Sequence, residues 1–164
     1  MIRIGVLSDT HLSGTSDFFY ELAASCFEDV SVILHAGDLT DLSVLEVFGD
    51  KEVHAVHGNM CHPAARAILP TKKVIEIGGF VIGLIHRVGN SYDFEKNLRD
   101  EFDEVDCIVY GHTHKAVCHR FGGVLYVNPG SFLPISPYGA SGTYVVLEAG
   151  NTLSGTIHKV KWPE

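Results

Sequence analysis

The chain has 164 residues, 46% of them hydrophobic, which suits one domain with its own buried core and excludes an intrinsically disordered chain. Twelve Lys and Arg residues against twenty Asp and Glu residues give a formal net charge of −8, which disfavours nucleic acids and anionic membranes as partners. We therefore expect a single domain over residues 1–164.

The cysteines and the first residues of the chain indicate a reducing compartment. The spacing of Cys26, Cys61, Cys107 and Cys118 matches neither a C-x-x-C metal site nor a secreted disulfide framework. The opening sequence MIRIGVLSDTH lacks the apolar stretch of a signal peptide, and no run reaches the roughly 18 apolar residues of a membrane span. We expect a cytoplasmic protein with reduced thiols.

Unbroken apolar runs rich in β-branched residues predict strands that are buried on both faces. In chain order these runs are Ile2 to Leu7, Val32 to Leu34, Val53 to Val56, Val81 to Ile85 and Cys107 to Tyr110.

Helical patterns lie between the predicted strands. Apolar side chains recur every four residues in two segments, one with Phe18, Leu22 and Cys26 and one with Phe94, Leu98 and Phe102. A shorter helix is predicted from Asp41, its N-cap, to Phe48, with Gly49 as its stop signal. Alternating strands and helices are typical of α/β folds.

Two further segments predict β-hairpins. Gly78-Gly79 separates Val74 to Ile77 from Phe80 to Ile85, and Gly150-Asn151 separates Thr143 to Leu147 from Thr152 to Val160. These hairpins favour a second, more antiparallel sheet. The fold class is therefore predicted as α/β, with two mixed sheets flanked by helices in a layered sandwich.

Each predicted interior strand ends at, or just before, a residue type that binds metal ions. These residues are Asp9 and His11, Asp38, Asn59, His86, and His112 with His114. The carboxyl ends of strands in an open α/β sheet face one crevice, so we expect these side chains to converge there. Carboxylate, amide and imidazole ligands in this number exceed a single tetrahedral zinc site and suit two divalent ions that share a bridging carboxylate.

The order of these motifs carries a resemblance to a known family. D-x-H ends at His11, G-D at Asp38 and G-N at Asn59, His86 follows a strand, and G-H-T-H ends at His114. This order resembles the calcineurin-like metallophosphoesterase superfamily. The short chain, with H-A-G-D at residues 35–38 and N-P-G-S at residues 128–131, resembles its small phosphodiesterase branch, to which the vacuolar sorting subunit Vps29 is also similar.

The resemblance implies a four-layer αββα sandwich and a role for each motif residue. It implies that one ion is held by Asp9, His11 and His114, that the other is held by Asn59, His86 and His112, and that Asp38 bridges them. Two such ions would neutralise the anionic oxygens of a phosphodiester and lower the pKa of a shared water, giving a hydroxide for in-line displacement.

The chain departs from the family pattern at the expected proton donor. Relatives carry His, or Cys then Asp, after the motif Asn, whereas this chain has Met60 and Cys61, and a thiol is a weak donor. We hypothesise that His62 or His57 supplies this proton, so that Asp38, Asn59 and His62 are the candidate catalytic residues. The alternatives are that both histidines are solvated loop residues, or that the substrate has a leaving group that needs no acid.

Arginine placement also departs from the family pattern. Arg87 follows His86 where relatives have Gly, and it could either bind a phosphate or pair with an acid such as Asp93. The Arg that relatives carry shortly after N-P-G-S is absent. His35 is expected to support the site from within its strand rather than to bind metal.

The main functional hypothesis is a metal-dependent phosphodiesterase acting on a small phosphate ester, without nucleic-acid or membrane partners. The alternative is a Vps29-like metal-binding interaction scaffold with little catalysis, and a nuclease is disfavoured because no basic track is present. Mn²⁺ is the expected cofactor, although Ni²⁺, Zn²⁺, Fe²⁺ or Co²⁺ would suit the same ligands. A homodimer is expected because it is the commonest closed assembly.

Overall fold

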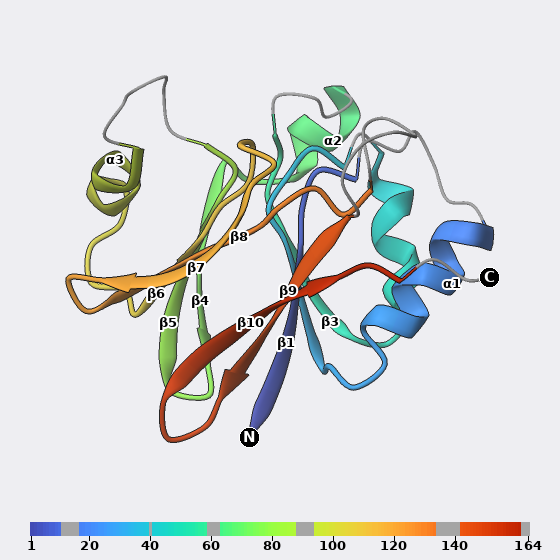
Figure 1. Cartoon of the computed structure of the whole chain (residues 1–164). Coiled ribbons are helices and arrows are strands. Elements are labelled where there is room, and N and C mark those ends of the chain that lie inside the picture. The colour runs from blue at the N-terminus through green and yellow to red at the C-terminus, as the bar shows by residue number, and fades with distance from the viewer. Residues whose placement is uncertain (11–16, 40, 59–62, 88–93, 134–141, 162–164) are drawn as a thin grey trace.

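Two five-stranded sheets pack face to face, and helices cover their outer faces (Figure 1). The computed structural model describes residues 1–10, 17–39, 41–58, 63–87, 94–133 and 142–161. No helix within these ranges is both long enough and apolar enough to cross a bilayer.

The first sheet has the strand order β10-β9-β1-β2-β3. Its parallel part consists of β1 (Ile2–Leu7), β2 (Val32–His35) and β3 (Glu52–Ala55). The strand β9 (Thr143–Ala149) runs antiparallel to β1, and β10 (Leu153–Lys159) runs antiparallel to β9. The sheet is therefore mixed, and the carboxyl ends of its parallel strands share one edge.

The second sheet has the strand order β4-β5-β6-β8-β7. Its parallel part consists of β5 (Phe80–Ile85), β6 (Cys107–Val109) and β8 (Val124–Pro129). The edge strands β4 (Lys72–Ile77) and β7 (Ala116–Phe121) run antiparallel to β5 and β8. The predicted hairpins at β4-β5 and β9-β10 are confirmed, but they lie in different sheets, so the expected second, more antiparallel sheet is replaced by two mixed sheets.

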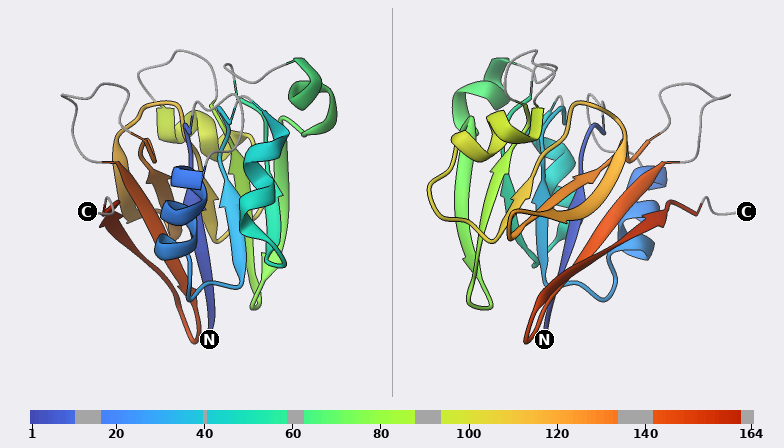
Figure 2. Two further views of the ribbon diagram at one scale, coloured as in Figure 1. Left: turned by 90° about the vertical axis from the view of Figure 1, so that its right-hand side faces the viewer. Right: turned by 60° about the vertical axis from the view of Figure 1, so that its left-hand side comes forward.

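The helices lie outside the sheets and at the end where the parallel strands finish (Figure 2). The helix α1 (Asp17–Cys26) and the 3₁₀ helix η1 (Leu42–Phe48) pack on the first sheet. The helix α3 (Phe94–Asp100) packs on the second sheet through Leu98, and α2 (Pro63–Ile68) follows β3.

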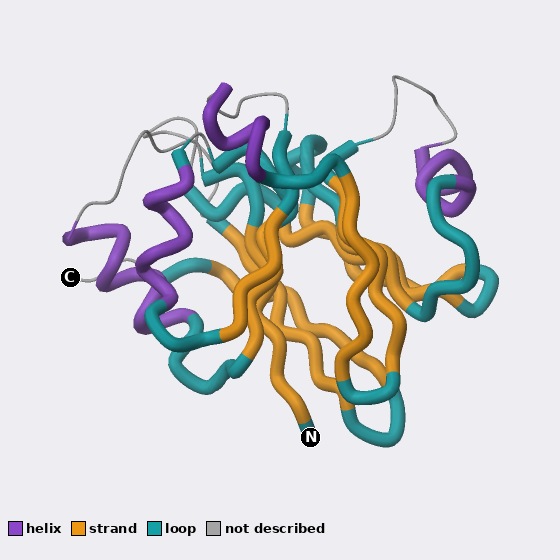
Figure 3. Tube along the Cα trace, turned by 180° about the vertical axis from the view of Figure 1, so that it is seen from behind, coloured by secondary structure: helices purple, strands orange, loops and turns teal. Residues whose placement is uncertain are grey.

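Three separate apolar clusters define the layers. One lies between the sheets and includes Val6 and Leu84, one joins α1 and η1 to the first sheet, and one joins α3 to the second. The view in Figure 3 shows the strands enclosed between the helices. The predicted four-layer αββα sandwich is confirmed.

The helices α1 and η1 lie where the sequence predicted them, but the buried face of α1 and the type of helix at η1 differ from the prediction. The buried face of α1 consists of Phe19, Leu22 and Ala23, whereas Phe18 is 42% exposed. A stripe with spacing i, i+3, i+4 begins at Phe19, and this spacing packs better than a single row of every fourth residue. The predicted helix after Asp41 is a 3₁₀ helix, in which Asp41 accepts a hydrogen bond from the Ser43 N–H as expected of an N-cap.

Candidate metal centre

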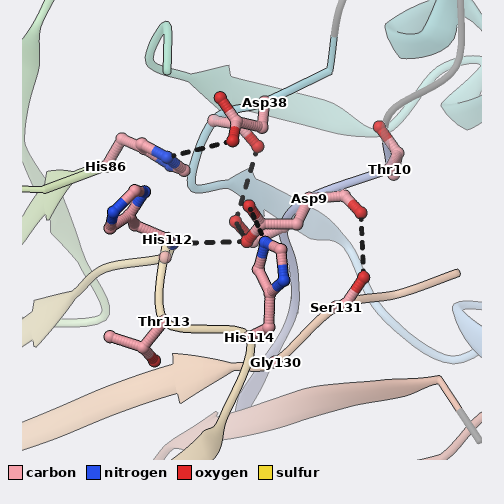
Figure 4. Close-up of polar contacts among 12 residues, drawn as sticks. Asp9, Thr10, Asp38, His86, His112, Thr113, His114, Gly130 and Ser131 are labelled. Atoms are coloured by element: carbon pink, nitrogen blue, oxygen red, sulfur yellow. Dashed lines mark hydrogen bonds and ion pairs between the residues drawn. The ribbon is translucent and has the colours of Figure 1, made fainter. Parts of the chain in front are cut away.

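The predicted ligands that the structure describes meet above the sheets, where the parallel strands end (Figure 4). From the first sheet, Asp9 follows β1 and Asp38 follows β2. From the second sheet, His86 follows β5, and His112 and His114 follow β6. The expected convergence of these side chains at one edge is present.

Asp38, His86 and His112 form the tightest group. Their nearest ligand atoms all lie within 4.8 Å of one another, and His86 Nε2 lies 3.3 Å from Asp38 Oδ2. The rings of His86 and His112 meet edge to face at 5.4 Å between centroids. Asp38 and His86 are almost completely buried, whereas His112 is half-buried, so the group opens to solvent on one side.

Asp9 lies beside this group and is completely buried. The Ser8 hydroxyl donates to Asp9 Oδ2 at 2.6 Å, and the His112 N–H donates to the same oxygen at 3.3 Å. The other oxygen, Oδ1, lies 3.2 Å from His114 Nε2. Asp9 and His114 therefore form a second carboxylate–imidazole pair next to the first.

Backbone strain is concentrated at the same residues. Within the described ranges, the non-glycine residues with positive φ are Asp9 (55°), Asp38 (57°), His112 (72°) and His114 (60°). The left-handed conformation is unfavourable for residues with a side chain and persists only where the surroundings impose it. Its occurrence at four converging ligand candidates indicates that the turns are shaped to aim these side chains.

The orientation of His86 is set by the backbone. Because a carbonyl oxygen only accepts, His86 Nδ1–H donates to Ala36 O, at 2.6 Å, and the lone pair of the neutral ring is therefore on Nε2. That lone pair faces the Asp38 carboxylate. Two electron-pair donors in this position need a proton or a cation between them, and a divalent metal ion fits this donor set.

Burial and neighbouring charges shift the pKa values of Asp9, His86 and His112. Burial raises the pKa of Asp9, against the hydrogen bond from Ser8. Burial alone would lower the pKa of His86, but the hydrogen bond to Asp38 and the charges of Asp38 and Asp9 raise it overall. Burial and the charges of His86 and Arg87 lower the pKa of His112.

His35 lies beneath the site, as the sequence predicted. It is completely buried, and its Nδ1 accepts from the Gly37 N–H at 3.1 Å. The proton of the neutral ring is then on Nε2, which lies 3.3 Å from Thr10 Oγ1. His35 thus braces the turn that presents Asp38.

Asn128 is a supporting residue whose role the sequence argument missed. It is completely buried, and its amide donates to Gly111 O at 3.1 Å and to Thr113 Oγ1 at 2.9 Å. The Gly130 N–H donates to its Oδ1 at 2.9 Å. Asn128 therefore fixes the turn between His112 and His114, and its place in N-P-G-S was the available signal.

Other predicted residues lie outside the described ranges or beside the site. His11, Asn59 and His62 fall outside them, as do Met60, Cys61 and Asp93. His57 is half-buried, with Nε2 at 3.1 Å from Thr71 Oγ1. Arg87 is exposed next to His86 and has no ion-pair partner among the residues that are described.

The comparisons with known proteins agree with this geometry. Residues 2–152 match the family model for the calcineurin-like phosphoesterase superfamily domain. The chain belongs to this superfamily. A probable metallophosphoesterase of Methanocaldococcus jannaschii is 36% identical over 135 residues, which cover 78% of this chain and 67% of that protein.

Two solved structures share the fold. Vacuolar protein sorting 29 of Cryptosporidium parvum superposes with a TM-score of 0.77 at 22% identity, covering 98% of this chain and 92% of the other. A novel archaeal phosphodiesterase superposes with a TM-score of 0.72 at 23% identity, covering 96% of this chain and 100% of the other. The metallophosphoesterase fold is confirmed.

Proposed function

We propose that this protein is a metal-dependent phosphodiesterase that hydrolyses a small phosphate ester. The observation that carries the proposal is the convergence of Asp9, Asp38, His86, His112 and His114 from two sheets, with left-handed backbone at four of them. A scaffold protein has no physical need for such strain around buried carboxylates. Family membership and the archaeal phosphodiesterase of the same fold support this assignment.

The ligand roles are proposed as the motif order implies them. Asp9, His11 and His114 would hold one divalent ion, Asn59, His86 and His112 the other, and Asp38 would bridge them. When bound, the ions would neutralise the phosphoryl oxygens and lower the pKa of a water molecule between them. Mn²⁺ is the proposed metal, because the carboxylate and amide oxygens of the proposed ligand set suit it.

The residues of the chain perform the remaining tasks. Ala36 O holds His86 in the tautomer whose Nε2 lone pair faces Asp38, and the Ser8 hydroxyl and the His112 N–H orient Asp9. His62 is proposed to give the proton to the leaving group, with His57 as the alternative.

Hydrolysis of bis(p-nitrophenyl) phosphate with added Mn²⁺ tests the activity. We expect Asp38→Ala and Asn59→Ala to lose at least about 100-fold in kcat/KM, since each removes metal-dependent charge stabilisation. The matched control is Asp50→Ala, which removes an exposed carboxylate outside the site and should retain wild-type activity. Equal rates in all four proteins would exclude the enzyme and favour the interaction scaffold.

Leaving-group dependence tests the proton donor. His62→Ala should lower kcat only slightly for methyl p-nitrophenyl phosphate, because the nitrophenolate leaving group needs no proton. For a diester with an alkoxide leaving group, the same variant should lower kcat by about 10²- to 10⁴-fold. His57→Ala serves as the parallel variant. If only His57→Ala shows this dependence, His57 is the donor, and if neither variant shows it, the reaction needs no side-chain acid.

A homodimer and a cytoplasmic location stay predictions. Light scattering on the purified protein measures the first, and a monomer at micromolar concentration would contradict it.

A further inference from the structure

A pocket of about 160 Å³ adjoins the metal centre. It is lined by His57, Gly58, Arg66, Thr71, His86 and Arg87. His86 belongs to both the pocket and the metal centre. Gly58 joins them as well, because a Cβ at this position would collide with the Asp38 carboxylate. A substrate whose scissile phosphate sits at Asp38 and His86 therefore has this pocket as its immediate neighbour.

Two arginines from separate elements give the pocket its charge. Arg66 lies on α2, and Arg87 follows β5. Neither has a carboxylate within ion-pair distance in the described part of the chain, although the whole protein carries a net charge of −8. Two positively charged side chains that line one pocket with no acidic partner repel each other. A bound anionic ligand would offset this repulsion.

Further hydrogen-bonding groups complete the wall. The His57 ring and the Thr71 hydroxyl contact each other at 3.1 Å between Nε2 and Oγ1, and both line the pocket. Guanidinium groups bind phosphate through two parallel N–H donors, which suits a ligand with several oxygens. The volume is below the roughly 300 Å³ of pockets that enclose a drug-sized molecule, so it suits one compact anionic group.

We propose that this pocket binds a second phosphate group of the substrate, with Arg66 and Arg87 as its main donors. The inference rests on the proposed function. It narrows the substrate class to phosphodiesters in which the group that remains attached to the scissile phosphate after hydrolysis carries a second phosphate. Arg66 and Arg87 are specificity residues in this view, because they discriminate between substrates and do not contact the reacting bond.

Equilibrium binding tests the pocket without catalysis. Calorimetric titration of the Mn²⁺-loaded protein compares thymidine 3′,5′-bisphosphate with thymidine 5′-monophosphate. We expect the wild type to prefer the bisphosphate by at least about tenfold, as charge-assisted bonds from two guanidinium groups would give. The double variant Arg66→Gln/Arg87→Gln should lose this preference, so that the ratio of the two affinities approaches one.

Arg3→Gln is the control for the loss of a positive charge outside the pocket. Arg3 lies at the start of β1, at the end of the strand opposite to Asp9. The ion-pair partner of Arg3 is Asp29, which does not line the pocket either. This variant should keep the full preference for the bisphosphate. If it loses the preference as well, long-range charge explains the binding and the pocket assignment is wrong.

A kinetic comparison separates this inference from the proposed function. The substrates are thymidine 5′-(p-nitrophenyl phosphate) with and without a 3′-phosphate, which share one leaving group. Hydrolysis of both at equal kcat/KM, together with equal affinity for the two nucleotides, would overturn the inference and leave the phosphodiesterase standing. A preserved binding preference with no hydrolysis of either ester would overturn the phosphodiesterase and leave the phosphate pocket standing. A preference that survives in the double variant, or no preference in the wild type, also overturns the inference.

Discussion

Single residues set the shape of this site through backbone conformation. Gly37 immediately precedes Asp38, has φ of +100°, and lies so close to His86 that an added Cβ would meet His86 Nδ1 at 2.6 Å. A residue with a side chain cannot occupy this position while His86 keeps its hydrogen bond to Ala36 O. The turn at Gly37 thus couples a first-sheet carboxylate to a second-sheet imidazole.

Gly37→Ala should therefore weaken metal binding specifically. We expect Mn²⁺ affinity to fall by about 10- to 100-fold, as when the group that orients a ligand is lost, measured by titration of the metal-free protein. Gly123→Ala is the control, because Gly123 also has positive φ (81°) but nothing lies within 4 Å of an added Cβ. Both variants should lose about 1–2 kcal/mol of stability from the left-handed backbone. Unchanged affinity in Gly37→Ala would show that the His86 orientation does not matter.

At the scale of elements, the ligands depend on a neighbouring strand that supplies none of them. Asn128, in β8, holds the loop after β6 through Gly111 O and the Thr113 hydroxyl. Asn128→Asp keeps the size of the side chain and replaces its donor by an acceptor facing two oxygens. We expect a loss of about 1–3 kcal/mol in the free energy of unfolding and weaker Mn²⁺ binding, measured by urea denaturation and metal titration.

Asn151→Asp makes the same chemical change in the exposed turn between β9 and β10. It should leave both quantities unchanged. If Asn128→Asp lowers stability but not metal affinity, the hydrogen bonds of Asn128 hold the strand and not the ligand loop.

A comparison of the elements with the predictions shows which parts of the fold could be predicted from the sequence. The interior strands were predicted correctly because unbroken apolar runs are local signals, and the residues that follow these strands could be named as candidate ligands for the same reason. The hairpin of β7 and β8 was missed because β7 is an edge strand that becomes exposed from His119 to Phe121, so its pattern resembles a loop. Asn128 was assigned no role because its partners lie 15 and 17 residues away, and only the folded chain brings them together.

At the scale of the whole molecule, the candidate metal centre lies where the two sheets meet. Asp9 and Asp38 come from the first sheet, whereas His86, His112 and His114 come from the second. Below them an apolar cluster that includes Val6 and Leu84 packs between the sheets. Burying two carboxylates at the end of this interface is unfavourable without cations, which the raised pKa of Asp9 reflects.

Removal of metal should consequently lower the stability of the whole fold. With free Mn²⁺ at about 100 times its Kd, binding to the native state alone stabilises by roughly 2.7 kcal/mol. At about 2–4 °C per kcal/mol for a chain of this size, EDTA should lower Tm by about 5–11 °C, as measured by calorimetry. In Asp38→Ala the Tm should respond to neither Mn²⁺ nor EDTA, because the residue that contacts His86 from the opposite sheet is missing. An equal shift in that variant would place the stabilising ion elsewhere in the molecule.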